Sequence, residues 1–276
     1  MHNSANHHDA TSYVHAISFV APGLPDWQHT QAVLRGESTY QAAELATYQP
    51  TLLPPNERRR ASPTVRMAFR IAEQLTRNTT TSAAQLACVF SSSDGDMAIA
   101  HRICNALADA TRLVSPTDFH NSVHNAAAGY WSIAANAKGP STAIAVFDFS
   151  FAAGLVEAHG MVQVEQQPTL MVVYDVPAVA PLCVNRPLTM PVGIGMIITP
   201  DPLNAIASLQ LQVDRATATP CNNIALEAMR TGNPAARGLP LLQAIATGSS
   251  DEVNIPFDEE RCLKVTLRTA AKGSSQ

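Results

Sequence analysis

The sequence predicts an α/β domain in which helices flank a mixed β-sheet. Short apolar runs of strand length alternate with longer stretches of helical periodicity, which is the pattern of layered α/β domains. The chain has 276 residues, of which 46% are apolar and 14% charged, so it can bury one large core. Several strand-like runs follow one another between residues 170 and 213, which indicates antiparallel strands beside the alternating part.

The first half of the chain gives the clearest element boundaries. A strand is expected over residues 13–20, and Asp26 begins a helix that continues to about Arg35. Ser62 and Pro63 begin another helix, because a capping hydroxyl precedes a proline at the first helical position. The apolar face of that helix carries Val65, Phe69, Ala72 and Leu75. The elements expected after it are a strand at 86–90, helices at about 97–107 and 119–134, a strand at 142–147 and a helix at 149–158.

The second half is predicted to hold more strands. Apolar runs of strand length occupy residues 170–174, 192–198 and 208–213, and residues 263–267 are expected to close the chain as an edge strand. Helices are expected near 224–230 and 240–247, and loops at the Pro/Ala/Thr-rich tracts 214–222 and 231–239. The chain is expected to form a single domain over 13–268, whose divergent part begins at 201. A disordered leader at 1–12 and a tail at 269–276 flank this predicted domain.

Composition argues against several classes of function. The chain has 18 basic and 22 acidic residues, so it lacks the basic surplus of a nucleic-acid binder. No apolar run approaches the ~20 residues of a membrane span, and the polar, histidine-rich start lacks the apolar core of a signal peptide. The five cysteines form no CxxC pair, which favours reduced thiols, and we expect Cys88 and Cys104 to be packed. These features predict a soluble, cytoplasmic protein.

The most informative segment is a strand, a sharp turn and a helix at Ala145–Phe151. Such a junction presents the side chain at the turn to the free N–H groups and the positive dipole end of the helix. Asp148 occupies that place, between Phe147 and Phe149, with Ser150 two residues later. A junction of this layout predicts that Asp148 is the position from which any chemistry would start.

The order of motifs around this junction resembles the β-ketoacyl synthases, over roughly residues 13–200. In that family a valine-serine-proline segment precedes a helix with asparagine and small residues, and a glycine-proline turn and a strand then lead to the nucleophile. The matching pieces here are Tyr13–Gly23 with Asp26-Trp27, Arg58-Arg59-Arg60 before a helix, the strand 86–90 with Asp94-Gly95, Val114-Ser115-Pro116, Asn125 with Ala126–Gly129, Gly139-Pro140, the junction itself, and Glu157-Ala158.

The resemblance implies a thiolase-like layered fold, the N-terminal half of a ketosynthase. Counting from Gly139-Pro140, it places the acyl-accepting cysteine of the family at Asp148. A carboxylate cannot replace the thiolate that forms the thioester intermediate. The family's second half also supplies two histidines and a glycine-rich loop for the oxyanion hole, and no histidine follows residue 200 here. The chain therefore resembles the non-catalytic, short chain-length-factor-like members of aryl polyene and polyketide clusters.

The same resemblance implies a partner. The family pairs subunits through the strand before the nucleophile, here Thr142–Phe147, which predicts a homodimer or a heterodimer with a full-length ketosynthase. Phe147, Phe149, Ser150 and Phe151 are candidates for lining an acyl pocket, and Arg58, Arg59 and Arg60 for docking an acyl carrier protein. No cofactor is expected.

Simpler interpretations remain open for each of these residues. For Asp148 the simpler interpretation is a helix cap, and for the phenylalanines it is packing in the core. For Arg58–Arg60 it is a solvated loop. Ser150 lacks the GxSxG pattern of a hydrolase nucleophile, and His120 and His124, spaced i, i+4 on the predicted helix 119–134, lack a third metal ligand.

Two alternatives to the chain-length-factor interpretation also remain open. One is a small acyl-handling enzyme that uses Asp148 with His120 or His124 as acid–base groups, and it predicts an open pocket at the helix start. The other is a scaffold or carrier-protein docking module without a pocket.

Overall fold

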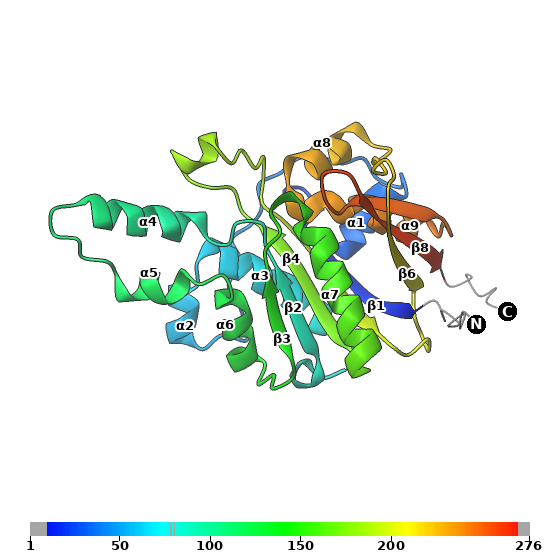
Figure 1. Ribbon diagram of the computed structural model, residues 1–276, viewed down its shortest axis with the longest axis horizontal. Coiled ribbons are helices and arrows are strands. Elements are labelled where there is room, and N and C mark those ends of the chain that lie inside the picture. Colours follow the sequence, from blue (N-terminus) through cyan, green and yellow to red (C-terminus); the bar gives the residue numbers. More distant parts are fainter. Residues whose placement is uncertain (1–9, 78, 80, 270–276) are drawn as a thin grey trace, which may run out of the picture.

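The computed structural model describes residues 10–77, 79 and 81–269, and it confirms a mixed sheet with flanking helices (Figure 1). The sheet has eight strands in the order β3-β2-β4-β5-β1-β6-β8-β7. β2, β3 and β4 run parallel to one another, and the remaining pairs are antiparallel, as the run of strands after residue 170 predicts. The strands are β1 (Thr11–Val20), β2 (Ala87–Ser91), β3 (Ser141–Ile144), β4 (Thr169–Asp175), β5 (Val192–Thr199), β6 (Ala207–Asp214), β7 (Glu252–Pro256) and β8 (Cys262–Thr269).

Helices cover both faces of the sheet. On one face α7 packs with α1, α8, α9 and the 3-10 turn η4 in one apolar cluster, and on the other face α3 and α6 form a second cluster. β2, β4 and β5 are buried at every position, as expected for strands covered on both sides. The helices are α1 (Trp27–Leu34), α2 (Pro55–Arg60), α3 (Pro63–Arg77), α4 (Met97–Ala108), α5 (Pro116–Asn121), α6 (Ala126–Ala134), α7 (Ser150–Glu165), α8 (Ile224–Gly232) and α9 (Leu239–Thr247), with 3-10 turns η1 (Ala83–Gln85), η2 (Phe147–Phe149), η3 (Leu182–Val184) and η4 (Pro234–Gly238).

The capping signals in the sequence place the helix starts correctly. The Asp26 carboxylate accepts from the His29 N–H at the start of α1, and Ser62 Oγ accepts from the Val65 N–H at the start of α3. The predicted apolar face of α3, from Val65 to Leu75, is buried against the sheet. Local capping chemistry therefore fixes how α3 enters the core.

The predicted helix over 119–134 is wrong, because two helices stand there. α5 ends at Asn121, and α6 begins at Ala126 after a turn in which Ser122 Oγ donates to the Phe119 carbonyl. Hydroxyls that bond their own backbone compete with helix continuation. As a result Phe119 is 71% exposed, and α4 and α5 project from the body at the left of Figure 1.

Several smaller expectations are also corrected. Arg58–Arg60 form the last turn of α2 rather than a loop. The strand predicted over 142–147 ends at Ile144, and Cys104 is exposed on α4 rather than packed. The Cys88 thiol is buried as predicted, and burial raises its pKa to about 12.

The two ends of the predicted domain need correction as well. β1 begins at Thr11, inside the predicted leader, and β8 extends to Thr269, one residue into the predicted tail, while residues 1–9 and 270–276 lie outside the described part of the chain. β8 is not an edge strand, because β7 pairs along its outer side. The Asn254 N–H of β7 in turn donates to Thr219 Oγ1, and the Asn254 carbonyl accepts from the Thr219 N–H, both at 2.9 Å. A neighbouring segment thus occupies the outer side of β7.

The C-terminal part of the chain is integral to the core. The tract 231–239, expected to be a loop, forms η4 with Pro234, Ala235, Ala236 and Gly238 buried. Gly238 lies so close to α7 that an added Cβ would stand 2.1 Å from Cζ of the Phe151 ring. Within the described residues, no helix is long and apolar enough to cross a membrane.

Candidate functional site

The candidate site is the turn between β3 and α7, which we call the elbow (residues 146–150). Phe147 has φ +47°, in the left-handed region that residues other than glycine seldom adopt. The Ser150 hydroxyl closes the turn, since it accepts from the Val146 N–H at 2.9 Å and donates to the Phe147 carbonyl at 2.8 Å. Strained backbone of this kind persists where the surrounding structure holds it, and it is enriched at functional sites.

Asp148 does not cap α7, so that simpler interpretation is wrong. The N-cap residue of α7 is Phe149, without a side-chain hydrogen bond to the helix. The Asp148 carboxylate instead accepts a 2.6 Å hydrogen bond from Nη1 of Arg186, in the loop between β4 and β5. Its side chain is 36% exposed, so the carboxylate lies at the surface of the elbow.

Arg186 joins three side chains from two separate segments, in a group that we call the arginine bracket (Asp94, Phe147, Asp148 and Arg186). Its Nε donates to Asp94 Oδ2 at 2.6 Å, and its guanidinium carbon lies 3.8 Å from the centre of the Phe147 ring. The Arg186 side chain is only 12% exposed. Burial alone would lower the pKa of Arg186, but the hydrogen bonds to Asp94 and Asp148 outweigh it and raise that pKa.

A third carboxylate, that of Asp175, is buried and connects to the bracket through Ser93. Asp175, at the end of β4, accepts from the Ser92 hydroxyl and from the Ser93 N–H and hydroxyl at 2.8–3.0 Å. Burial raises the pKa of Asp175 to about 7, although these hydrogen bonds act to lower it. The Ser93 hydroxyl also lies 2.9 Å from Asp94 Oδ2, so the buried carboxylate and the bracket form one polar network.

The topology of the sheet explains why these groups meet. β3, β2 and β4 are adjacent and parallel, so their carboxyl ends share one edge. The elbow follows β3, Ser92–Asp94 follow β2, and Asp175 ends β4. Open α/β sheets place their sites at this edge.

The predicted pocket residues divide into accessible and internal positions. Phe147 is 58% exposed and Phe149 is half-buried, whereas Ser150 and Phe151 are fully buried. Ser150 is committed to the turn, and the ring of Phe151 packs against η4. Only Phe147, Asp148 and Phe149 of the predicted set are open to a ligand or a partner.

The two histidines do not form a pair on one helix. His120 lies on α5 with its ring edge-on to Tyr130, while His124 lies in the turn before α6, where Nε2 is 3.0 Å from the Ser92 carbonyl oxygen. Across residues 10–77, 79 and 81–269, no cluster of three or more His, Cys, Asp or Glu side chains could hold a metal ion.

The predicted docking arginines differ in their contacts. Nη2 of Arg58 donates to the Leu53 carbonyl at 2.8 Å, so this side chain anchors the preceding loop. Arg59 and Arg60 are exposed, and Arg60 lies 3.8 Å from Glu57. The accessible positive charge of α2 therefore comes from Arg59 and Arg60.

Sequence reasoning identified Asp148 but missed Arg186 and Asp175. Arg186 lies 38 residues from Asp148 in an irregular loop, where no periodicity marks it. Asp175 could have been found, because a carboxylate that directly follows a buried strand is a recognisable signal at the carboxyl edge of a sheet.

Comparisons with known proteins agree with this architecture. The family model described as the β-ketoacyl synthase N-terminal domain matches residues 27–261. A comparison of the sequence with curated proteins finds no match.

Solved structures with the same fold come from ketosynthase assemblies. A chain from the complex of the ketosynthase ApeO with its chain length factor ApeC from Xenorhabdus doucetiae is 21% identical, with a TM-score of 0.70 over 93% of this chain and 99% of that one. A chain from the ishigamide ketosynthase/chain length factor is 13% identical, with a TM-score of 0.72 over 95% and 100% of the two chains. A chain from AntDE:AntF, a type II acyl carrier protein in complex with its ketosynthase, is 8% identical, with a TM-score of 0.73 over 95% and 100%.

Proposed function

Because the chain belongs to the β-ketoacyl synthase N-terminal domain family, we propose that it is a non-catalytic, chain-length-factor-type subunit. In this role it pairs with a ketosynthase in aryl polyene, polyketide or fatty-acid-type biosynthesis and shapes the space for the growing chain. The observation that carries the proposal is the arginine bracket, in which the position of the family's nucleophile holds an ion-paired carboxylate.

The bracket opposes acyl transfer in two ways. An acyl thioester needs a thiolate nucleophile, and a carboxylate would form a mixed anhydride instead. One oxygen of the Asp148 carboxylate also accepts a 2.6 Å hydrogen bond from the Arg186 guanidinium, so this oxygen is already engaged. The chain alone is therefore expected to perform no condensation.

The composition of the similar structures supports the pairing with a ketosynthase. The Xenorhabdus doucetiae complex consists of a ketosynthase and its chain length factor, and the ishigamide structure has the same two components. The match spans 99% and 100% of the two solved chains, so the fold of each is represented here over nearly its whole length.

The open side of β3 provides the surface for a partner. β3 is the last strand on its side of the sheet, with β2 as its neighbour. The Pro140 and Ile144 carbonyls accept from β2 at 2.9 and 3.1 Å, so the alternate residues Ser141 and Ala143 present their N–H and C=O groups outward. A strand from a partner can add to this edge through four residues, Ser141–Ile144, rather than through the longer segment predicted from sequence.

An acyl carrier protein is the second proposed partner. Arg59 and Arg60 offer exposed positive charge at the end of α2, which suits an acidic protein surface. Carrier docking alone, without a role in chain length, would use the same two side chains. The alternative of an independent acyl-handling enzyme has less support, because Asp148 is ion-paired and His120 and His124 lie on separate elements.

The test is co-purification with the ketosynthase encoded beside its gene, using Ala143→Pro against Ala143→Val. Proline removes the outward N–H and leaves the bonds from Pro140 and Ile144 to β2 in place, so it should abolish the complex on size-exclusion chromatography. Valine keeps the N–H and should preserve the complex.

The same complex tests the role in chain length. Phe149→Ala and Asp148→Ala should change the length distribution of the products measured by mass spectrometry. A chain that co-purifies with no ketosynthase, or a complex whose product lengths ignore both substitutions, would contradict the proposal.

A further inference from the structure

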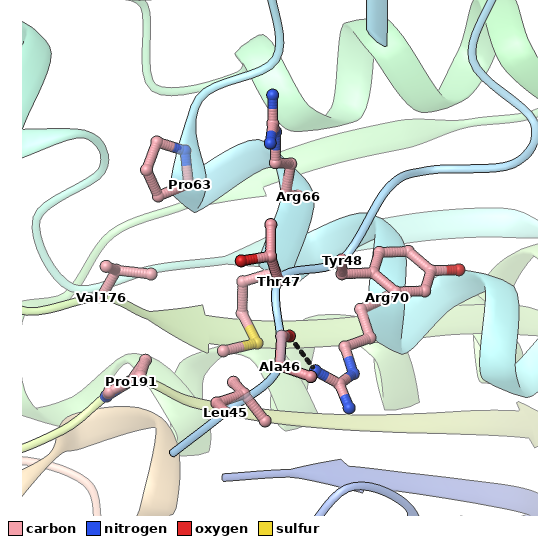
Figure 2. Close-up of a pocket in the computed structure, with 10 residues that line it drawn as sticks. Leu45, Ala46, Thr47, Tyr48, Pro63, Arg66, Arg70, Val176 and Pro191 are labelled. Atoms are coloured by element: carbon pink, nitrogen blue, oxygen red, sulfur yellow. Dashed lines mark hydrogen bonds between the residues drawn. The ribbon is translucent and has the colours of Figure 1, made fainter. Parts of the chain in front are cut away.

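A separate cavity of about 270 Å³ lies on the other side of the sheet from the elbow helix α7, between α3 and the segment 39–54. We call this segment, which contains neither helix nor strand, the strap. In Figure 2, Val176 and Pro191 lie on the left of the cavity, opposite Tyr48 and Arg70 on the right. Leu45, Pro63 and Met67 complete a wall that is mostly apolar.

The strap is fixed in place, so the cavity is formed before any ligand arrives. The buried Glu73 carboxylate accepts from the Tyr48 hydroxyl, the Thr51 hydroxyl and the Leu52 N–H at 2.5–3.0 Å. Nη1 of Arg70 donates to the Ala46 carbonyl at 3.0 Å, which is the dashed line in Figure 2. A preformed wall avoids the entropy loss of ordering a loop on binding.

Two guanidinium groups give the cavity an unbalanced positive charge. Arg66 and Arg70 are one turn apart on α3, a spacing at which like charges repel. Among the described residues, neither forms an ion pair with a carboxylate within 4.0 Å, although Arg70 is only 9% exposed. Burial lowers the pKa of Arg70, and the electrostatic influence of Tyr48 and of the Asp26 carboxylate offsets this only in part.

The two arginines differ in the donors that remain for a ligand. Arg70 uses Nη1 and Nη2 on the Ala46 and Pro25 carbonyls. Arg66 donates from Nε to the Ala61 carbonyl at 2.9 Å and from Nη2 to the Arg58 carbonyl at 3.5 Å. Within the described chain, Nη1 of Arg66 makes no hydrogen bond, so it is free to meet a singly charged head group.

We propose that this cavity binds a medium-chain carboxylate, with its head group at Arg66 and its apolar body against Met67, Leu45, Val176 and Pro191. The volume is below the roughly 300–1,000 Å³ of sites that enclose drug-sized ligands, which selects a small molecule. The apolar wall favours a hydrocarbon body, and the free guanidinium donor favours an anion over a neutral polar group. The site uses neither the elbow nor the β3 edge, so it stands independently of the proposed function.

Octanoate is the probe, and octanol, which has the same body without the charge, is its control. Isothermal titration should give saturable octanoate binding, with octanol at least ~10-fold weaker, because a charge-assisted hydrogen bond is lost. In protein labelled with ¹³C at its methionine methyl groups, octanoate should shift the Met67 signal, assigned by Met67→Leu, while Met171 in the opposite core cluster stays unchanged.

Two substitutions and a matched control localise the binding. Arg66→Gln should weaken octanoate at least ~10-fold, and Val176→Phe should block the cavity while keeping both arginines. Arg59→Gln removes a more exposed positive charge that does not line the cavity, and it should leave octanoate binding unchanged. Equal binding of octanol and octanoate, a Met67 signal that does not move, or equal weakening by Arg59→Gln would overturn the proposal.

Discussion

At the residue scale, Arg186 holds the candidate site together, although it lies in an irregular loop. One side chain meets Asp94 after β2 and Asp148 after β3, and it lies over the Phe147 ring. The sequence predicted the position of Asp148 from the strand–turn–helix layout, but a loop arginine far along the chain has no local pattern that pairs it with a carboxylate. Long-range ion pairs of this kind depend on the assembled sheet edge.

Arg186→Gln should destabilise the folded chain by about 1–2 kcal/mol, because it leaves two carboxylates close together without their cation. The expected loss of folding free energy is modest because the Asp148 side chain is 36% exposed and screened by water. Urea denaturation measures the change. Arg215→Gln is the matched control, since the Arg215–Glu260 pair is 80% and 72% exposed and should cost less than about 0.5 kcal/mol. Equal losses in the two variants would show that the bracket contributes no more than a surface pair.

Asp175 should make stability depend on pH between about 4 and 7. The carboxyl keeps its proton in the folded chain up to a pKa of about 7, against a usual value of 3.8. Raising the pH from 4 to 7 therefore ionises Asp175 in the unfolded chain only, which favours unfolding, and the dependence ends above the folded pKa. Below pH 4 the contribution of Asp175 to stability is fully present.

Asp175→Asn isolates this effect, since an amide oxygen can still accept from Ser92 and Ser93. The unfolding free energy of the native chain, minus that of the variant, should fall as pH rises from 4 to 7 in denaturant titrations. Carboxyls with lowered pKa, such as Asp118 beside Arg102, act in the opposite direction but are common to both proteins. A difference that is constant with pH would mean that Asp175 is ionised throughout.

At the element scale, elements with local signals were predicted well and those defined by tertiary contacts were not. Ser62-Pro63 and the apolar face that follows predict α3 from the sequence. η4 has no periodicity, and its Pro/Ala-rich sequence is typical of loops. It is nevertheless buried, because it packs against the apolar side of α7. β3 was predicted too long, since residues 145–147 turn away from the sheet to form the elbow.

Gly238→Ala tests the contact between η4 and α7. The new Cβ would stand 2.1–2.7 Å from three atoms of the Phe151 ring, which has no free space to move into the core. We expect a loss of about 1–3 kcal/mol in thermal or urea denaturation. Adding Phe151→Leu should restore part of that loss, because the smaller side chain relieves the overlap.

Gly160→Ala is the control, since an added Cβ at this position of α7 meets nothing within 4 Å. It should be neutral or stabilising by up to about 1 kcal/mol, as expected for glycine replaced within a helix. A Gly238→Ala variant as stable as Gly160→Ala would mean that η4 shifts freely on α7.

At the scale of the whole molecule, residues after 200 form part of the core rather than an appendage. The sequence predicts strands and helices there but does not indicate how they pack on the rest of the domain. In the structure, α8, η4 and α9 bury apolar side chains against α7 and the strands in the same cluster. That role could not be predicted, because it depends on which face of α7 is left uncovered.

A chain that ends at residue 200 should therefore fail to fold. It would expose the outer side of α7 and the β1 edge that β6 covers. Circular dichroism and size-exclusion chromatography should show loss of the cooperative unfolding transition and aggregation. A truncated chain that stays monomeric and unfolds cooperatively would mean that the first 200 residues are an independent unit.

The two ends of the sheet have consequences for stoichiometry. At β7 the backbone of Asn254 is already engaged by Thr219, and Pro256 has no N–H to offer. Among the strands of the described residues, this leaves the β3 end to accept another strand. A molecule with two receptive ends could add copies without limit and grow into a filament, whereas one with a single receptive end is terminated by its first partner. If the chain pairs through β3 as proposed, self-association would stop at two chains, and each copy that pairs with a ketosynthase would be withdrawn from that pool.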